Sequence, residues 1–302
     1  MARIDTQQGM ELSTILDFVR WTFSTLNQSD IYYGHGTDNA WDEAFALVLG
    51  CLSLPPDTDT QLFQANLTSI EKETLCSALD KRINQRLPLA YITNTTQFAG
   101  IDFYIDDRAL IPRSPIAELI ENNFSPWFIE PPKNILDLCT GGGCIALACA
   151  MYNPDACVDG VDISSDALAV AQLNNERLGL TEQVTFHQSD LYQAVTGNRY
   201  DLILTNPPYV DQEDMDNLPT EYRHEPELAL ASGADGLDCA REIISHAAEH
   251  LTDDGVLILE VGNSAPALEE AYPGLEFMWL EFERGGAGVC MLQREQLLKL
   301  SN

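Results

Sequence analysis

The chain has 302 residues, which suits two domains or one domain with an appended module. Its net charge is −31 at pH 7, a sign that repels nucleic-acid phosphates, so we expect no direct sequence-specific binding of nucleic acid. No apolar run approaches the roughly 20 residues of a membrane span, so we expect no membrane association.

Two further features predict a cytoplasmic protein. The first residues lack the basic stretch and apolar core of a secretion signal. The eight cysteines show no metal-like pairing, so we expect reduced thiols, no disulfides and no metal site. The acidic residues are spread along the whole chain, which favours a solvated surface, although the same charge would attract a basic protein partner.

Residues 1–95 predict a small helical domain. Apolar residues recur at helix spacing in three segments, Leu12–Phe23, Ala44–Leu52 and Leu75–Leu87, and Pro88 ends the third. Residues 32–41 form a polar, glycine-containing loop that carries three aromatic residues. This loop is either a plain connection between helices or a contact for a partner.

Residues 96–111 predict a β-hairpin linker that turns at Ala99 and Gly100. The third part of the chain, residues 112–302, then begins with a helix. We expect Ser114 to cap this helix and Pro115 to occupy its first turn. Arg113 directly precedes it, and an ordinary surface arginine is the simplest interpretation of that residue.

Strands and helices alternate from residue 134 onward, which predicts a parallel sheet in an α/β fold. The expected strands are residues 134–138, 158–163, 184–187, 200–205 and 255–260. The expected helices between them are residues 143–151, 165–178 and 237–251. Residues 275–282 and 288–292 predict a terminal antiparallel hairpin. The predicted architecture is therefore a Rossmann-like seven-stranded sheet, preceded by the small helical domain.

A glycine-rich segment follows the first predicted strand, at the sheet edge where ligands bind in such folds. It consists of Asp137, Leu138, Cys139, Thr140, Gly141, Gly142 and Gly143. Glycines let the backbone approach a ligand closely, but Ala146 breaks the fingerprint of a dinucleotide site, and Asp137 would repel a phosphate. A carboxylate here suits a cationic or polar ligand, such as the amino-acid end of S-adenosylmethionine.

Acidic residues also follow the second and third predicted strands. Asp162 stands where an acidic residue accepts the ribose hydroxyls of a nucleoside cofactor, and Asp190 is placed to accept from an adenine amino group. A single aspartate at a strand end is usually a helix cap or a turn residue. Three of them after successive strands, with the glycine segment, predict a nucleoside site.

The fourth predicted strand is followed by Asn206, Pro207, Pro208 and Tyr209. A residue before proline is pushed out of the helical region, and proline has a fixed φ and no N–H. The resulting stiff corner offers an amide, carbonyl oxygens and an aromatic face to a planar, amide-like or amine-like nitrogen. An ordinary loop turn is the competing interpretation of this motif.

Together these segments resemble the class I S-adenosylmethionine-dependent methyltransferases over residues 134–293, and residues 206–209 resemble their amino-methylating branch. Four further motifs, and the helical N-terminal domain, are similar to the protein glutamine methyltransferases: residues 86–93, 110–118, 225–233 and 235–238. Three segments are similar to the branch that modifies a glutamine of ribosomal protein L-three: residues 33–39, 113–115 and 260–264. Gly142 departs from the pattern, because Ser or Thr is common at that position.

The resemblance implies methyl transfer from S-adenosylmethionine to the side-chain amide nitrogen of a glutamine in ribosomal protein L-three, a basic partner. It implies a substrate-recognition role for residues 1–95. The implied catalytic residues are Asn206, Pro207, Pro208 and Tyr209, which would also bind substrate together with Arg113. The implied cofactor-binding residues are residues 137–143, Asp162, Ile163, Asp190, Leu191 and Asn206.

Three other functions compete with this one. A methyltransferase acting on the glutamine of peptide-chain release factors shares the chemistry, and only the branch motifs separate it. An adenine-N6 nucleic-acid methyltransferase would need a basic groove, which the net charge of −31 disfavours. A non-catalytic ribosome-assembly module would not need the intact motif at residues 206–209.

Overall fold

The computed structural model describes residues 6–301, and the chain divides into two compact units. The first contains the chain up to Thr96 together with Pro219–His224, and the second contains Gln97–Leu218 and the chain from Glu225 onward. The predicted linker hairpin belongs to the second unit from Gln97 onward. No sequence pattern indicated that residues 219–224 would group with the helices. Residues 1–5 of the predicted helical domain, and residue 302, lie outside the described part.

The first unit is built from five α-helices among its described residues: α1 (Thr6–Glu11), α2 (Ile15–Asn27), α3 (Ala40–Cys51), α4 (Ser69–Asn84) and α5 (Leu89–Thr93). Capping boxes fix the starts of two of them, because Thr14 and Asp17 bond reciprocally at α2 and Thr68 and Glu71 at α4. The apolar faces pack on one another in a separate core. The helical periodicity of this region is therefore confirmed, although α4 ends at Asn84, three residues before the end of the predicted segment Leu75–Leu87.

Buried charges hold residues 219–224 within the first unit. Arg82 and Glu221 are each only 2% exposed, and their Nη1 and Oε1 atoms lie 3.4 Å apart. Arg82 also forms an ion pair with the buried Glu43. Glu221 accepts further bonds from the Arg86 guanidinium at 3.2 Å and from the Tyr32 N–H at 2.9 Å. The opposite charges attract one another, and this attraction offsets the free-energy cost of removing them from water.

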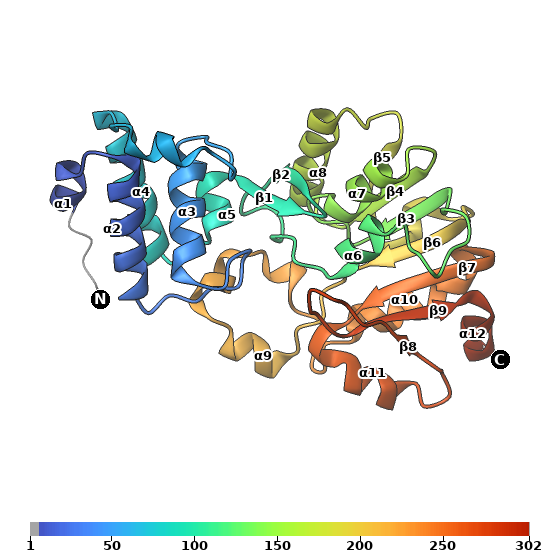
Figure 1. Ribbon diagram of the computed structural model, residues 1–302. Helices are drawn as coiled ribbons and strands as arrows, with labels where there is room; N and C mark the ends of the chain where they lie inside the picture. The colour runs from blue at the N-terminus through green and yellow to red at the C-terminus, as the bar shows by residue number, and fades with distance from the viewer. Residues whose placement is uncertain (1–5, 302) are drawn as a thin grey trace. The chain divides into compact units, whose positions relative to one another are not determined.

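The second unit contains a seven-stranded sheet in the order β5-β4-β3-β6-β7-β9-β8 (Figure 1). The strands are β3 (Asn134–Leu138), β4 (Cys157–Asp162), β5 (Val184–Gln188), β6 (Tyr200–Thr205), β7 (Leu251–Glu260), β8 (Met278–Trp279) and β9 (Val289–Gln293). The first five run parallel, whereas β9 is antiparallel to β7 and β8. The predicted seven-stranded α/β sheet with a terminal antiparallel pair is confirmed.

A short hairpin, β1 (Thr95–Phe98) and β2 (Ile101–Tyr104), precedes this sheet. Its turn places Ala99 and Gly100 at φ +48° and +69°. Left-handed conformations at both central residues match the twist of the two strands. The predicted hairpin and its turn position are therefore confirmed.

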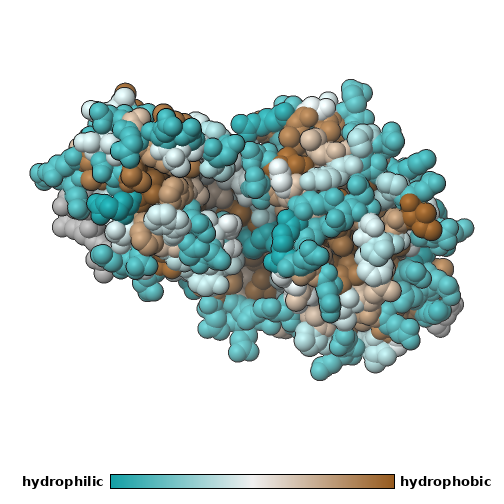
Figure 2. Space-filling model, viewed as in Figure 1, coloured by the Kyte–Doolittle hydropathy of each residue, from teal (hydrophilic) through white to brown (hydrophobic). Residues whose placement is uncertain are grey.

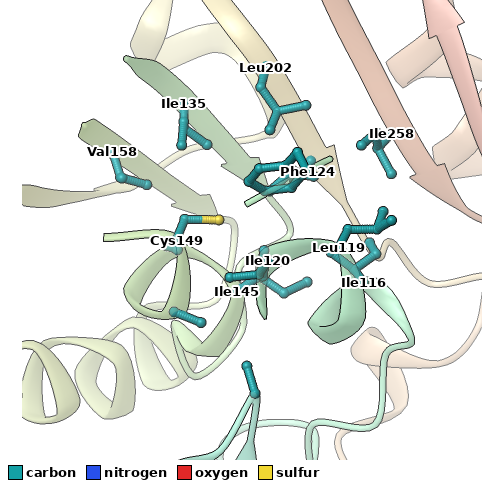
Figure 3. Close-up of a cluster of buried hydrophobic side chains, with 14 of the residues drawn as sticks. Ile116, Leu119, Ile120, Phe124, Ile135, Ile145, Cys149, Val158, Leu202 and Ile258 are labelled. Atoms are coloured by element: carbon teal, nitrogen blue, oxygen red, sulfur yellow. The ribbon is translucent and has the colours of Figure 1, made fainter. Parts of the chain in front are cut away.

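Helices cover both faces of the large sheet (Figure 1). One face carries α6 (Ile116–Glu121), α7 (Cys144–Tyr152) and α8 (Ser165–Leu178), and the other carries α10 (Asp238–His250), α11 (Ala265–Ala271) and α12 (Arg294–Leu298). Figure 3 shows the core of the first face, where Phe124 lies between Leu202 of β6 and Ile120 of α6. Burying each such side chain contributes about 1.5–3 kcal/mol to folding.

Several element boundaries differ from the predictions. Helix α8 keeps its predicted bounds, and its cap is Ser164, whose hydroxyl accepts from the Ala167 N–H. Strand β7 begins at Leu251, and β8 is only two residues long. The short helix α9 (Gln212–Asn217) was not predicted.

The surface seen in Figure 2 is largely hydrophilic. Within residues 6–301 there is no helix with the length and apolar character that crossing a membrane would require.

Candidate active site

A cavity of about 400 Å³ lies at the carboxyl ends of the parallel strands. Strand β3 has β4 on one side and β6 on the other, so the chain order reverses here, which is where open α/β sheets bind ligands. The loops after β3, β4, β5 and β6 supply much of the wall, with residues 226–233 and the start of α10. The predicted cofactor residues that line it are Cys139, Thr140, Gly141, Gly142, Asp162, Ile163, Asp190, Leu191 and Asn206.

The remaining predicted site residues divide into two groups. Pro208 and Arg113 line the cavity. The residues outside its lining are Asp137, Leu138, Gly143, Pro207 and Tyr209. Their predicted roles in binding cofactor or substrate stay predictions. The contacts described below show the structural role of several of them.

Asp137 is fully buried behind the glycine segment. Its Oδ2 accepts from the Thr140 hydroxyl at 2.5 Å and from the Ala146 N–H at 3.0 Å. These two bonds close the segment around the carboxylate, so Asp137 shapes the cavity wall from behind. Burial raises the pKa of this carboxyl to about 7, although both hydrogen bonds favour the charged form.

The raised pKa of Asp137 makes stability depend on pH. The unfolded carboxyl ionises near 3.8 and the folded one near 7, so the folded chain binds more protons between these values and loses stability as pH rises through them. We expect the unfolding free energy of the wild type to fall by at most about 4 kcal/mol relative to Asp137→Asn across that window. Urea unfolding of both proteins at several pH values measures it, and a pH-independent difference would contradict the assignment.

Glycine is required at position 143 but not at position 142. Gly143 has φ +81°, and a Cβ there would lie 2.8 Å from the Phe186 ring and 2.9 Å from Ala171. At Gly142 a Cβ would meet Val170 at 3.5 Å, an ordinary contact. The fold therefore has room for a side chain at position 142, so the glycine that replaces the usual Ser or Thr there is not required by packing.

We expect Gly143→Ala to destabilise the protein by about 1–3 kcal/mol, because it combines backbone strain with overpacking. Gly142→Ala is the matched control and should change stability by less than about 0.5 kcal/mol. Urea midpoints followed by circular dichroism compare the two. Equal midpoints for both variants would contradict this account of the segment.

Asp162 joins the ends of β3 and β4. Its Oδ2 accepts from the Gly141 N–H at 2.8 Å and its Oδ1 from the Ser164 N–H at 2.9 Å. Burial raises the pKa of this carboxyl. A carboxylate has about four acceptor positions, so these two bonds leave capacity for ligand hydroxyls. Asp190 is exposed at the rim of the same cavity.

The corner after β6 is fixed by contacts on both sides. The Thr205 hydroxyl donates to the Leu138 carbonyl at 2.9 Å, which ties β6 to β3. The Tyr209 hydroxyl donates to Glu260 at 3.3 Å, and the Tyr209 carbonyl accepts from the Ser264 hydroxyl at 2.9 Å. A Cβ at residue 262 would lie 2.6 Å from the Tyr209 ring, so that glycine leaves room for it. Asn206 is thereby presented at the cavity from a rigid support.

The buried Glu260 is held in turn from α6 and the residues before it. Glu260 accepts from the Ser114 hydroxyl at 2.5 Å, and burial raises its pKa. Ser114 in turn accepts from the Ile116 N–H, so its role at the start of α6 is close to the predicted cap, although α6 itself begins after Pro115.

Arg113 is not an isolated surface arginine. Its guanidinium donates two hydrogen bonds, of 2.8 and 2.9 Å, to the carboxylate of the buried Glu225. Glu225 also accepts a hydrogen bond from the Ile111 N–H at 3.0 Å. Glu225 and Glu260 appeared in the sequence only inside longer motifs. No local pattern indicated which residues they would contact.

Comparison with known proteins gives the family. The family model of the methyltransferase small domain matches residues 119–223. A protein of Francisella tularensis subsp. tularensis (strain SCHU S4) described as ribosomal protein uL3 glutamine methyltransferase is 47% identical over 290 residues, which cover 95% of this chain and 92% of that protein. One of Neisseria meningitidis serogroup B (strain MC58) with the same description is 47% identical over 294 residues, 97% of each chain.

A solved methyltransferase structure from Pyrococcus furiosus is 16% identical, with a TM-score of 0.47, over 65% of this chain and 89% of that one. The close relatives span nearly the whole chain, both units included. The resemblance inferred from the motifs is confirmed, and the protein is a methyltransferase. The chain belongs to the family of ribosomal protein uL3 glutamine methyltransferases.

Proposed function

We propose that this chain transfers the methyl group of S-adenosylmethionine to the side-chain amide nitrogen of a glutamine in ribosomal protein uL3, the L-three of the resemblance. The observation that carries the proposal is the 47% identity to two proteins of that description over at least 95% of the chain. A net charge of −31 complements a basic ribosomal protein. We place the reaction in the cytoplasm, where the eight free cysteines would stay reduced.

The cavity suits the proposed cofactor chemically. Its volume lies within the range of small-molecule sites, and carboxylates at Asp162 and Asp190 can accept hydroxyl and amino hydrogens. Two arginines also line it, but Arg108 pairs with Asp106 and Arg113 with Glu225. These pairs neutralise the cationic groups, which favours a nucleoside ligand without a phosphate chain.

We assign the following residues to the cofactor. Asp162 holds the ribose hydroxyls, Asp190 the adenine amino group, and residues 139–142 the amino-acid end. When bound, S-adenosylmethionine supplies an electrophilic methyl group on its sulfonium. Asp137 and Gly143 act indirectly, by fixing the shape of the glycine segment.

We assign the orientation of the substrate to the corner after β6. An amide nitrogen is a poor nucleophile, because its lone pair is delocalised into the carbonyl. The Asn206 Oδ1 and the Pro207 carbonyl would accept its two hydrogens and hold the nitrogen about 3 Å from the carbon it attacks. The same oxygens would stabilise the positive charge that develops on the nitrogen. Pro208 stiffens the corner, and Tyr209, held by Glu260 and Ser264, positions it.

Mass spectrometry of two candidate substrates tests this proposal. The purified protein is mixed with isotope-labelled S-adenosylmethionine, unmethylated uL3 and an unmethylated peptide-chain release factor. We expect one labelled methyl group on a glutamine of uL3. Label on the release factor alone would keep the chemistry and overturn the substrate. Label on neither, with the cofactor still bound, would favour a binding role in ribosome assembly.

A further inference from the structure

We propose that Cys139 and Cys239 form a reversible disulfide within the cofactor cavity, so that oxidation of this thiol pair displaces the cofactor. The two Sγ atoms lie 3.9 Å apart, in contact, although the residues are 100 positions apart in sequence. Both thiols are half-buried, and both line the cavity. An oxidant that enters the cavity therefore reaches the two sulfurs together.

The surrounding backbone aims the two thiols at each other. Cys139 follows β3 in a left-handed conformation, with φ +58°. Cys239 is the second residue of α10, and its N–H donates to the Ser232 hydroxyl at 3.1 Å. Because a disulfide bond is about 2.05 Å long, the sulfurs need to approach by only about 2 Å. Small movements of the loop and of the first turn of α10 would supply that distance.

A peroxide supplies the oxidising equivalents. A thiolate attacks one peroxide oxygen, giving a sulfenic acid and, after proton transfer, water from hydrogen peroxide. The second thiolate then attacks the sulfenic sulfur, and the hydroxyl leaves as a second water. Two thiols and one peroxide thus give one disulfide and two waters.

Cys239 is the better first nucleophile. The contact with the Cys139 thiol lowers the pKa of Cys239, while burial and the nearby Asp190 and Asp162 oppose that shift. The same contact raises the pKa of Cys139, together with its burial. Cys139 is therefore the resolving thiol, placed to attack once Cys239 is oxidised.

The consequence for the cofactor rests on the proposed function. Cys139 is followed by Thr140 and Gly141, which Asp137 and Asp162 hold in place as the cavity wall. A bond from Cys139 to α10 would pull this wall across the cavity and compete with a bound ligand. By the same linkage, bound S-adenosylmethionine should protect both thiols from oxidation.

The test oxidises the full-length reduced protein with hydrogen peroxide, alkylates the remaining thiols and maps the digest by mass spectrometry. Titration calorimetry measures S-adenosylmethionine affinity before oxidation, after oxidation and after re-reduction. We expect a Cys139–Cys239 linked peptide and a dissociation constant raised by at least about tenfold, restored by reductant. Saturating cofactor present during oxidation should suppress the link.

Two kinds of variant sharpen the test. Cys239→Ser and Cys239→Ala should give no link, and the dissociation constant of each should be the same before and after peroxide. Cys157→Ser is the matched control, because Cys157 is exposed at the opposite end of β4, and it should behave as the wild type.

If Cys139 and Cys239 remain free thiols after exhaustive oxidation and are both found alkylated, the proposal is wrong. A Cys139–Cys239 disulfide that leaves the affinity for S-adenosylmethionine unchanged would also overturn it. Failure of the reduced wild type to bind S-adenosylmethionine would overturn the cofactor assignment and with it the coupling. The mass spectrum would still decide separately whether the link forms.

Discussion

Asn206→Ala should reduce methyl transfer by at least about a thousandfold, while the dissociation constant of S-adenosylmethionine changes by less than about threefold. Asn206 lines the cavity at the end of a corner that Thr205, Tyr209 and Glu260 hold in place. Alanine keeps this support and removes only the acceptor that orients the substrate nitrogen. Loss of turnover with little loss of cofactor binding would follow, because the oriented nitrogen matters for the reaction itself.

Radiolabel transfer to uL3, with titration calorimetry for the cofactor, measures both quantities. Asn217→Ala is the matched control, because this asparagine is exposed on α9, and its activity should equal that of the wild type. Undiminished transfer by Asn206→Ala would rule out the proposed role. A large loss of cofactor affinity would instead assign Asn206 to the nucleoside site.

Asp162→Ala should weaken S-adenosylmethionine binding by about a hundredfold, because a hydrogen bond to a charged group is worth about 1.5–3 kcal/mol. Two losses combine here. The ribose hydroxyls would lose their acceptor, and the Gly141 and Ser164 N–H groups would lose theirs. The melting temperature separates them, since loss of the loop contacts lowers stability without any ligand.

Asp162→Asn sharpens the same experiment, because it keeps one carbonyl acceptor and removes the charge. We expect its affinity to lie between those of the wild type and Asp162→Ala. Asp155→Ala is the control for charge alone, since Asp155 is exposed in the turn that precedes β4. An Asp162→Ala protein with an unchanged dissociation constant would refute the ribose assignment.

Local sequence signals predicted much of the fold. Strands β3 and β6 have their predicted bounds, because each contains a short apolar run and is followed by a glycine segment or a proline pair. Strand β7 begins earlier than predicted, since Asp253 and Asp254 are exposed and interrupt the apolar pattern. The strand is nevertheless continued there by pairing of Leu251 with Tyr200, which no local pattern reveals.

The candidate site also combines residues that local sequence signals could place and contacts that they could not. Residues that end strands, such as Asp162 and Asn206, could be placed because parallel strands bring their carboxyl ends to one edge. Partners could not be predicted where two distant segments meet. The contacts of Arg113 with Glu225 and of Ser114 with Glu260 join residues more than 100 positions apart, and one sequence carries no signal for such pairs.

The placement of residues 219–224 has a consequence for dissecting the protein. The chain passes between the two units at residues 96/97, 218/219 and 224/225, so one cut cannot separate them. A fragment that ends at residue 96 would leave Arg82 buried without Glu221, and one that starts at residue 97 would expose Glu221 without Arg82 and Arg86. Neither unit should therefore fold stably when it is expressed without the other. A chain cut at residue 96 should have a lower free energy of unfolding than one cut at an ordinary linker between two domains.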